Sequence, residues 1–253
     1  EGGREGGAGM PWSDFAPKAD APREAHLVAA LFTACEEGDS ERVYLVLKDC
    51  TKEGYNLDEV INATTEDGAT PLFYAAKAGH LETVNVLLHT GHAIVNKGTK
   101  AGFTPMWMAA LRGKHEVLQV LLHQYGIMVD QPAKDGRTAL YAACESGNVH
   151  CVELLLKSGA KPDHSRRRPD NSSPLTVAAY LGHVEIVNML LEAGAKLMHK
   201  DEDGSALDNA RRQGHEEVVK VLLKKMKQVG LTEEDLNDDM VVYARSDDAT
   251  QDL

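Results

Sequence analysis

Two His-Glu pairs are the first candidates for chemistry in this sequence of 253 residues. A helix that carries His-Glu-x-x-His binds zinc through its two histidines, and the glutamate acts as the general base of a metalloprotease. The pairs are His115-Glu116 and His215-Glu216. Gln119 and Val219 stand where the second histidine is required. Neither pair therefore predicts a metal site.

An acidic stretch around Asp201 and Asp203 suggests a calcium-binding loop of the EF-hand type, which needs a glycine at its sixth position and carboxylates at both ends. Aligning Gly204 with that glycine places His199 first and Ala210 last, so both end ligands are missing. The sequence also lacks a Gly-Lys-Ser/Thr phosphate loop and a Gly-x-Ser-x-Gly nucleophile elbow. We expect a protein without a catalytic site, cofactor or metal.

The four cysteines do not form a Cys-x-x-Cys pair or a Cys/His ligand pattern. They are Cys35, Cys50, Cys144 and Cys151. Buried thiols that act as small apolar residues explain them best, and a metal or disulfide role is the alternative.

The charge balance limits the class of partner. With 27 Lys and Arg against 39 Asp and Glu, the formal net charge is −12. Contacts to nucleic-acid phosphates and to anionic membrane surfaces need clustered Lys and Arg. No apolar run approaches the roughly 20 residues that span a bilayer. Another protein is therefore the expected partner.

The sequence repeats itself with a period close to 34 residues. Its units share a turn residue, a Thr-Pro-type helix start, small residues, a glycine and a pair of leucines. The turn residues are Gly68, Gly102, Gly136, Asn171 and Gly204, and the later glycines are Gly79, Gly113, Gly147, Gly182 and Gly214. This self-similarity indicates a stack of small helical units.

Each unit carries the signals for two short helices. In the first complete unit, Asp67-Gly68 supplies a turn with positive φ, and Thr70-Pro71 caps and begins a helix. Ala75-Ala76 lets neighbouring helices approach closely, and Gly79 ends the helix in a left-handed conformation. Apolar residues at helical spacing over 81–88 then predict a second helix with one buried face.

This pattern resembles the ankyrin repeat over residues 25–229. The resemblance implies an all-α solenoid of stacked helix-turn-helix units with short β-turn fingers, about six units including the caps, which binds partners through its concave face and finger tips. Residues 1–24 are then a Gly/Pro-rich flexible leader, and residues 230–253 are an acidic C-terminal tail.

The two end units depart from the pattern. Residues 31–38 predict an N-terminal cap repeat without a Thr-Pro start, and we expect residues 55–61 of the longer connection that follows it to pack beneath the cap. Asp208 and Arg211 replace an aromatic or His and an alanine in the last unit. That surface can meet water, as a C-terminal cap requires.

The resemblance predicts a histidine after each Thr-Pro-Leu, and other residues stand there. They are Phe73, Trp107, Tyr141 and Thr176. The usual Thr-His hydrogen bond is therefore absent. The aromatic rings either seal neighbouring repeats against each other or, in the case of Trp107, reach the concave groove as an anchor for a partner.

The family's usual binding positions can be projected onto the concave helices. The candidates are Tyr74, Lys77, Trp107, Met108, Leu111, Arg112, Glu145, Tyr180 and Leu181. Leu111, Tyr180 and Leu181 are apolar at positions that are commonly polar on a free solenoid. Such residues either mark an interface or are single exposed apolar residues of the kind that occur on any protein surface.

The three arginines Arg166, Arg167 and Arg168 form the only dense basic run, on a predicted finger. Guanidinium groups bind carboxylates and phosphates bidentately. Three interpretations of this run are open. It is a solvated loop tip that pairs with the chain's own acidic tail, a binding site for an acidic protein, or a contact to nucleic acid or phospholipid. We place it at the rim of the partner site.

The complete array without a reactive constellation predicts a non-catalytic adaptor or accessory subunit that binds another protein, with a multi-subunit complex as one setting. The alternatives are a regulatory inhibitor that occludes an enzyme or a nucleic-acid-binding protein, and a recognition arm of a larger enzyme assembly. No apolar signal segment is visible at residues 1–9. Cytoplasm or nucleus is the default location, and an organelle reached through a removed import sequence is the alternative.

Overall fold

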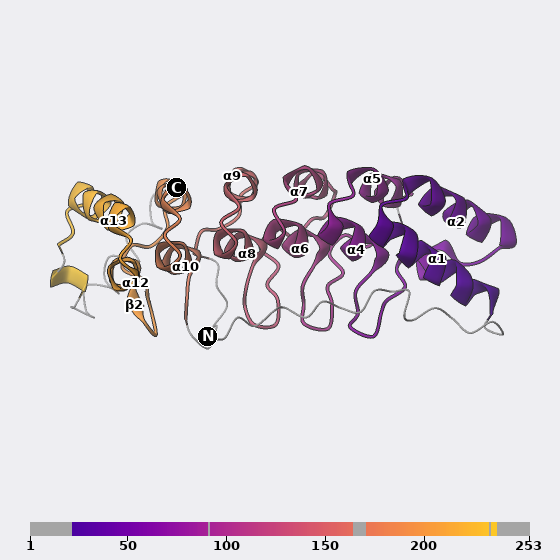
Figure 1. The fold of residues 1–253 in the computed structure, drawn as a ribbon, viewed down its shortest axis with the longest axis horizontal. Helices are drawn as coiled ribbons and strands as arrows, with labels where there is room; N and C mark the ends of the chain where they lie inside the picture. The colour runs from indigo at the N-terminus through magenta and orange to yellow at the C-terminus, as the bar shows by residue number, and fades with distance from the viewer. Residues whose placement is uncertain (1–21, 91, 164–170, 233, 237–253) are drawn as a thin grey trace.

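The computed structural model describes residues 22–90, 92–163, 171–232 and 234–236. Pairs of antiparallel helices stack side by side in one long array (Figure 1). The inner row, from which the finger loops extend, contains α1 (Arg23–Glu37), α4 (Pro71–Ala78), α6 (Pro105–Leu111), α8 (Ala139–Glu145), α10 (Pro174–Tyr180) and α12 (Ala206–Gln213). The outer row contains α2 (Ser40–Glu53), α5 (Leu81–His89), α7 (His115–Leu122), α9 (Val149–Lys157), α11 (Val184–Glu192) and α13 (Glu216–Gln228).

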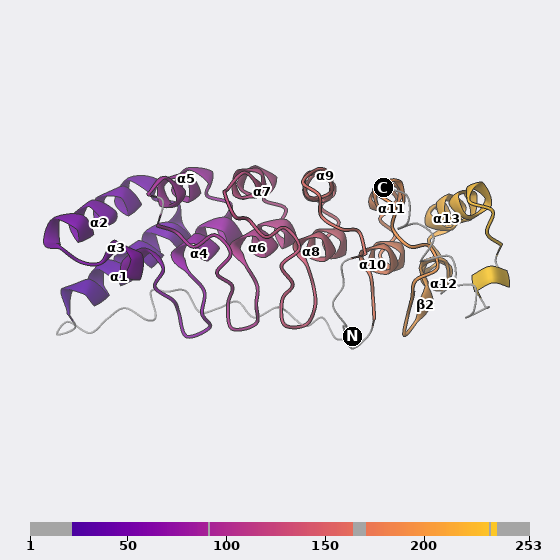
Figure 2. The same cartoon turned by 180° about the vertical axis from the view of Figure 1, so that it is seen from behind.

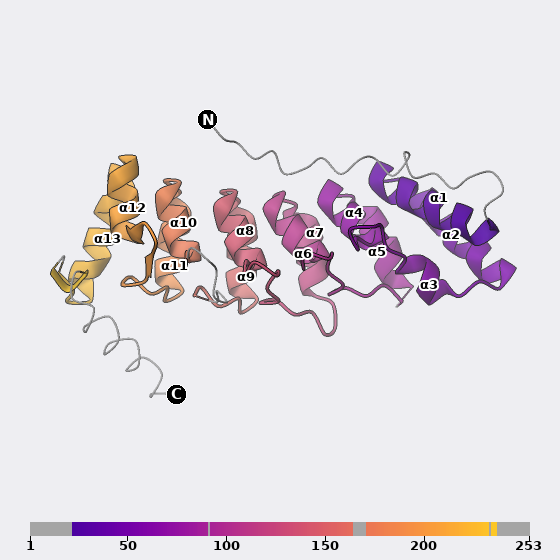
Figure 3. The ribbon, with the colours of Figure 1, turned by 90° about the horizontal axis from the view of Figure 1, so that it is seen from below.

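The prediction of an all-helical solenoid is confirmed. Besides the two rows, the described residues include the short helix α3 (Leu57–Ile61) and a 3-10 turn at Glu234–Leu236. Their strands are β1 (Lys200–Asp201) and β2 (Gly204–Ser205), which pair antiparallel in the last finger. Seen from below, each helix pair lies next to the following pair along the array (Figure 3). In the described part of the chain, no helix has the length and apolar character needed to cross a membrane.

Side-chain caps begin every inner-row helix except α1, as the Thr-Pro-type starts of the later units predict. The hydroxyl of Thr70 accepts a hydrogen bond from the backbone N–H of Phe73 at 3.2 Å. Thr104, Thr138, Ser173 and Ser205 cap the following helices in the same way. These caps satisfy backbone donors that would otherwise be unpaired at the start of each helix.

The finger turns are left-handed and stack on one another. Gly68 and Gly102 have φ angles of +83° and +87°. The backbone N–H of Lys100 donates to the carbonyl of Asp67 at 2.6 Å, and the N–H of Lys134 donates to the carbonyl of Ala101 at 2.8 Å. Neighbouring fingers are therefore joined through their backbones.

The core runs along the array between the two rows. The paired alanines of four inner-row helices are fully buried, which allows the close helix approach that they predict. These are Ala75, Ala76, Ala109, Ala110, Ala142, Ala143, Ala178 and Ala179. All four cysteines are free and buried, so the prediction of core thiols is confirmed. Burial raises the pKa of the Cys151 thiol to about 11.

Both ends of the array are closed as the sequence predicts. Helix α3 packs against α1 and α2 at the N-terminal end of the array (Figure 2), and its Val60 and Ile61 are buried. At the other end, Asp208 and Arg211 are exposed and Ala210 is buried, so α12 turns its charged side to solvent. Beyond residue 236, the predicted acidic tail lies outside the described residues.

Candidate binding surface

Most of the candidates occupy equivalent positions on consecutive inner-row helices. The structure places eight of them along the exposed side of this row, which we call the inner face: Tyr74, Lys77, Met108, Leu111, Arg112, Glu145, Tyr180 and Leu181. Tyr180 and Leu181 are 42% and 38% exposed, although both are large apolar or aromatic side chains. Arg166, Arg167 and Arg168 lie outside the described residues.

Of the two interpretations of Trp107, the structure supports the sealing of neighbouring repeats and contradicts an open position in the groove. Trp107 is 3% exposed, and its ring stacks on Phe103 with centroids 4.1 Å apart. It occupies the first turn of α6 beside the finger, so its ring packs into the repeat rather than onto the inner face. Phe73, Tyr141 and Thr176 are buried at the equivalent positions. These side chains therefore seal the array.

Arg137 is the central residue that sequence reasoning missed. Its Nε donates to Oδ2 of Asp135 at 2.7 Å, and its Nη1 donates to Oε2 of Glu145 at 3.2 Å. The guanidinium lies over the stacked rings of Phe103 and Trp107, at 5.6 and 5.4 Å from their centroids. Glu145 is therefore held within the chain. The sequence did contain a signal for this role, because Arg137 follows the Asp-Gly turn at a position where the other fingers carry small or apolar residues.

A cationic hollow opens at the end of the inner face nearest the N-terminal cap. Its lining residues are Glu36, Tyr74, Lys77, Ala78, Arg112 and Lys114. The ring of Tyr74 packs edge-on against Phe32 with centroids 5.7 Å apart, and Nζ of Lys77 lies 5.8 Å from the same ring. Desolvation raises the pKa of the Tyr74 phenol, and the charge of Glu36 raises it further.

An acidic hollow opens near the C-terminal cap, beside the β1–β2 finger. Its lining residues are Tyr141, Ser172, Thr176, Val177, Tyr180, Asp201, Glu202, Asp203 and Asn209. The amide of Asn209 donates to Oδ1 of Asp201 at 3.2 Å, and Arg212 forms an ion pair with Asp203. Asp201 and Asp203, which resemble part of a calcium-binding loop in the sequence, therefore belong to the β1–β2 finger.

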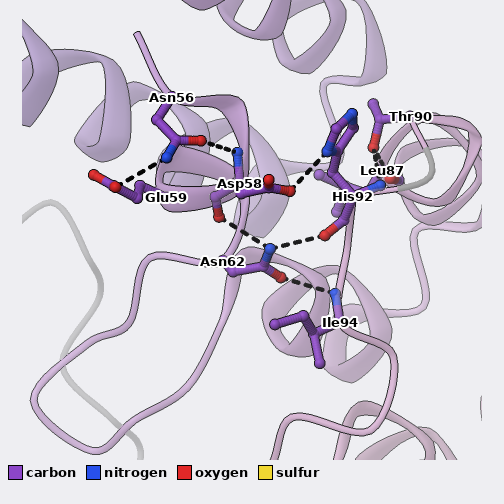
Figure 4. Close-up of polar contacts among 8 residues, drawn as sticks. All are labelled: Asn56, Asp58, Glu59, Asn62, Leu87, Thr90, His92 and Ile94. Atoms are coloured by element: carbon purple, nitrogen blue, oxygen red, sulfur yellow. Dashed lines mark hydrogen bonds and ion pairs between the residues drawn. The ribbon is translucent and has the colours of Figure 1, made fainter.

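The edge where outer-row helices lead into the next finger carries a second periodic feature (Figure 4). The side-chain amide of Asn62 donates to the carbonyl of His92 at 2.8 Å and accepts from the N–H of Ile94 at 2.8 Å. Asn96 repeats this arrangement with Gly126 and Met128, at 2.7 and 3.0 Å. Each asparagine thus pins the connection of the following repeat.

The next two repeats use aspartate for the same purpose. Asp130 accepts from the N–H of Lys161 at 3.2 Å, and Asp163 accepts from the N–H of Lys196 at 3.0 Å. The pinned N–H comes four residues after the end of the outer-row helix at Lys161 and Lys196, but five and six residues after it at Ile94 and Met128. A carboxylate only accepts hydrogen bonds, whereas an amide also donates. Where the stretch from the helix end to the pinned N–H is longer, the amide therefore also bonds the carbonyl that this stretch presents.

The histidines of the two His-Glu pairs have structural neighbours. Nε2 of His215 forms a hydrogen bond to the carbonyl oxygen of Tyr180 at 3.0 Å, which ties the last repeat to the one before it. The ring of His115 lies 5.4 Å from that of His150. Among the residues that the structure describes, no group of three or more His, Cys, Asp or Glu side chains is arranged to hold a metal ion.

Comparison with known families agrees with this architecture. The family model described as ankyrin repeats (3 copies) matches residues 23–97, 92–166, 123–201 and 163–234. The chain belongs to the ankyrin repeat family. A search of curated proteins finds no match. Ankyrin repeats are generally protein–protein interaction modules and are typically non-catalytic.

Proposed function

We propose that this chain is a non-catalytic adaptor or accessory subunit that binds a partner protein across its inner face. The observation that carries the proposal is the exposure of Tyr180 and Leu181 on the same face as Leu111 and Met108. Apolar side chains grouped on one side of a rigid array lose water-exposed surface when a partner covers them. They are the natural anchors of the interface.

The remaining polar contacts support a scaffold that is already organised for binding. Arg137 fixes Glu145, Arg212 fixes Asp203, and His215 is bonded to the backbone of Tyr180. A partner that docks on such a surface does not have to order it first, and ordering is one of the main costs of association. This favours recognition over chemistry as the task of the inner face.

The test uses the chain as bait in affinity purification followed by mass spectrometry, with two matched double variants. Leu111→Glu with Leu181→Glu adds two charges to the inner face. Gln119→Glu with Asn188→Glu adds two charges to exposed positions of α7 and α11, in the same two repeats but on the outer row. Circular dichroism and thermal melting establish that both variants are folded.

We expect the inner-face variant to lose a specific partner that the outer-row variant retains. Equal recovery of that partner by both variants overturns the proposal and places the interface elsewhere. If the recovered partner is an enzyme, its activity with and without this chain distinguishes an inhibitor from an adaptor. Catalytic subunits that co-purify in fixed ratio indicate the recognition arm of an enzyme assembly.

A further inference from the structure

The charge of the inner face changes sign along the array. The cationic hollow is lined by three cationic side chains and one carboxylate. The acidic hollow is lined by three carboxylates, of which Asp203 is paired with Arg212. From α6 to α10 the inner face carries the apolar Met108 and Leu111 on α6, Glu145 paired with Arg137 on α8, and Leu181 directly after Tyr180 at the end of α10. The chain has a net charge of −12, so the charge of the cationic hollow is opposite in sign to the net charge of the molecule.

The three cations of the first hollow are available to a ligand. In the described part of the chain, no carboxylate forms an ion pair with Lys77, Arg112 or Lys114. The aliphatic part of Lys114 crosses Gly79, since a Cβ on that glycine would lie 2.7 Å from its Cδ. Lys77 is held over the ring of Tyr74. Two of the three charges are therefore positioned before any ligand arrives.

In the described part of the chain, only one of the three carboxylates that line the acidic hollow forms an ion pair, Asp203 with Arg212. Asn209 is a neutral partner for Asp201, so the hydrogen bond leaves the charge of that carboxylate in place. Glu202 is exposed at the finger tip and forms no ion pair among the described residues. Tyr180 lies at the wall of the hollow, where the stem of an extended lysine or arginine can cover its ring.

We infer that the partner segment bound by the inner face is dipolar, with acidic side chains over the cationic hollow, apolar side chains in the middle and Lys or Arg side chains over the acidic hollow. This inference rests on the proposed function, because it assigns the chemistry of the partner at the same site. The hollows are separated by about three helix spacings of roughly 9 Å each. An extended chain covers that span with about ten residues.

Complementary charge at both ends gives the segment one preferred direction on the array. A reversed segment would place carboxylates beside Glu202 and cations beside Lys77 and Arg112, and like charges placed together cost free energy. A nucleic-acid strand satisfies only the first hollow, because its phosphates meet carboxylates at the second. A protein segment is therefore the better fit.

The test measures fluorescence anisotropy with synthetic peptides. The dipolar probe carries a glutamate block and an arginine block separated by about ten Ser, Leu and Tyr residues. Three further peptides replace the glutamate block, the arginine block or both with glutamine. The protein variants are Lys77→Glu with Arg112→Glu, and separately Glu202→Lys. A thymidine oligonucleotide serves as the polyanion control.

We expect the dipolar peptide to bind most tightly, by about tenfold over the neutral peptide at low salt. Lys77→Glu with Arg112→Glu should weaken only the peptides that contain the glutamate block. Glu202→Lys should weaken only the peptides that contain the arginine block. Equal binding of all four peptides, or failure of all four to bind, overturns the inference. Oligonucleotide binding as tight as that of the dipolar peptide also overturns it.

The direction of binding has its own readout. A fluorophore on the glutamate block should transfer energy more efficiently to an acceptor at Glu37→Cys than at Gln213→Cys, at opposite ends of the inner row. The native cysteines are buried and do not compete for the label. The reverse order overturns the inference. If Leu111→Glu with Leu181→Glu abolishes binding of the natural partner and the charge variants have no effect, the proposed function stands and the dipolar inference fails.

Discussion

The imidazole ring of His183 covers Gly147 so closely that a Cβ on the glycine would lie 2.8 Å from Cε1 of the ring. Gly147 has a φ angle of +72°, and His183 follows the corresponding glycine of the next repeat. The same relationship joins Gly182 to His215 and Gly113 to Asn148. At these three helix-to-helix turns, glycine is therefore required both by its own backbone and by the side chain stacked on it.

Replacing Gly147 with valine should destabilise the array by about 2 kcal/mol or more, because a β-branched residue is forced into a left-handed conformation and against His183. Gly214 supplies the control. Its φ angle is +74°, but nothing lies within 4 Å of a Cβ there. Gly147→Ala should therefore cost more than Gly214→Ala in thermal melting. Equal losses would show that backbone strain alone accounts for the requirement.

Stability should fall when the solution becomes mildly acidic, because burial, aided by the charge of His215, lowers the pKa of His183. The unfolded chain binds the proton near the ordinary value of about 6.5, whereas the folded chain resists it. His183 therefore contributes to the free energy of unfolding above the ordinary histidine pKa, and this contribution is lost as the pH falls towards the pKa of the folded chain. Denaturant unfolding between neutral and acidic pH measures the loss.

The control for this pH dependence is His183→Asn, because Asn148 already occupies the equivalent position of the preceding repeat. The variant should have a flatter dependence of unfolding free energy on pH than the parent chain. Parallel curves for the two proteins would mean that His183 titrates alike in the folded and unfolded states.

The pinned connections predict a difference between chemically similar substitutions. Asn96→Asp removes the donor to the Gly126 carbonyl and leaves two acceptors facing each other, which should cost about 1 kcal/mol or more. Asp130→Asn keeps the acceptor for the N–H of Lys161 and should be nearly neutral. Urea unfolding measures both. A larger loss for Asp130→Asn would contradict the assignment of amides to the longer connections.

The periodic sequence was sufficient to predict the helix pairs, their caps and the glycine turns, because these depend on local conformation. Thr70 and Gly79 act within their own unit, and each unit repeats the same signals. The inner-face positions also follow from the period. Whether a partner uses these positions remains a prediction, since the exposure of Tyr180 or Leu181 does not identify what covers them.

Contacts between units were less predictable. The burial of Trp107 depends on Phe103 of its own finger and on Arg137 of the next one. The choice of asparagine at Asn62 depends on the length of a connection in the following repeat. Such pairings join residues one period apart, so a pattern averaged over the repeats conceals them. A comparison of each unit with its neighbour, rather than with a consensus, would have revealed them.

Arg137 provides the last prediction, because it links three features that sequence reasoning treated separately. Arg137→Met keeps an extended apolar stem and removes the hydrogen bonds to Asp135 and Glu145 together with the cation above Trp107. We expect a loss of about 2 kcal/mol, since charge-assisted hydrogen bonds and a cation–π contact disappear together at a site with low exposure. In a Trp12→Phe background, the emission of Trp107 should also shift to the red.

Arg212→Met is the matched control for Arg137→Met. Arg212 is paired with the exposed Asp203, and surface ion pairs contribute little to stability. This variant should change the unfolding free energy by less than about 1 kcal/mol and leave the emission of Trp107 unchanged. If both variants melt alike and neither shifts the emission, the guanidinium of Arg137 does not cover the Phe103–Trp107 stack in solution, and Glu145 is then free to meet a partner on the inner face.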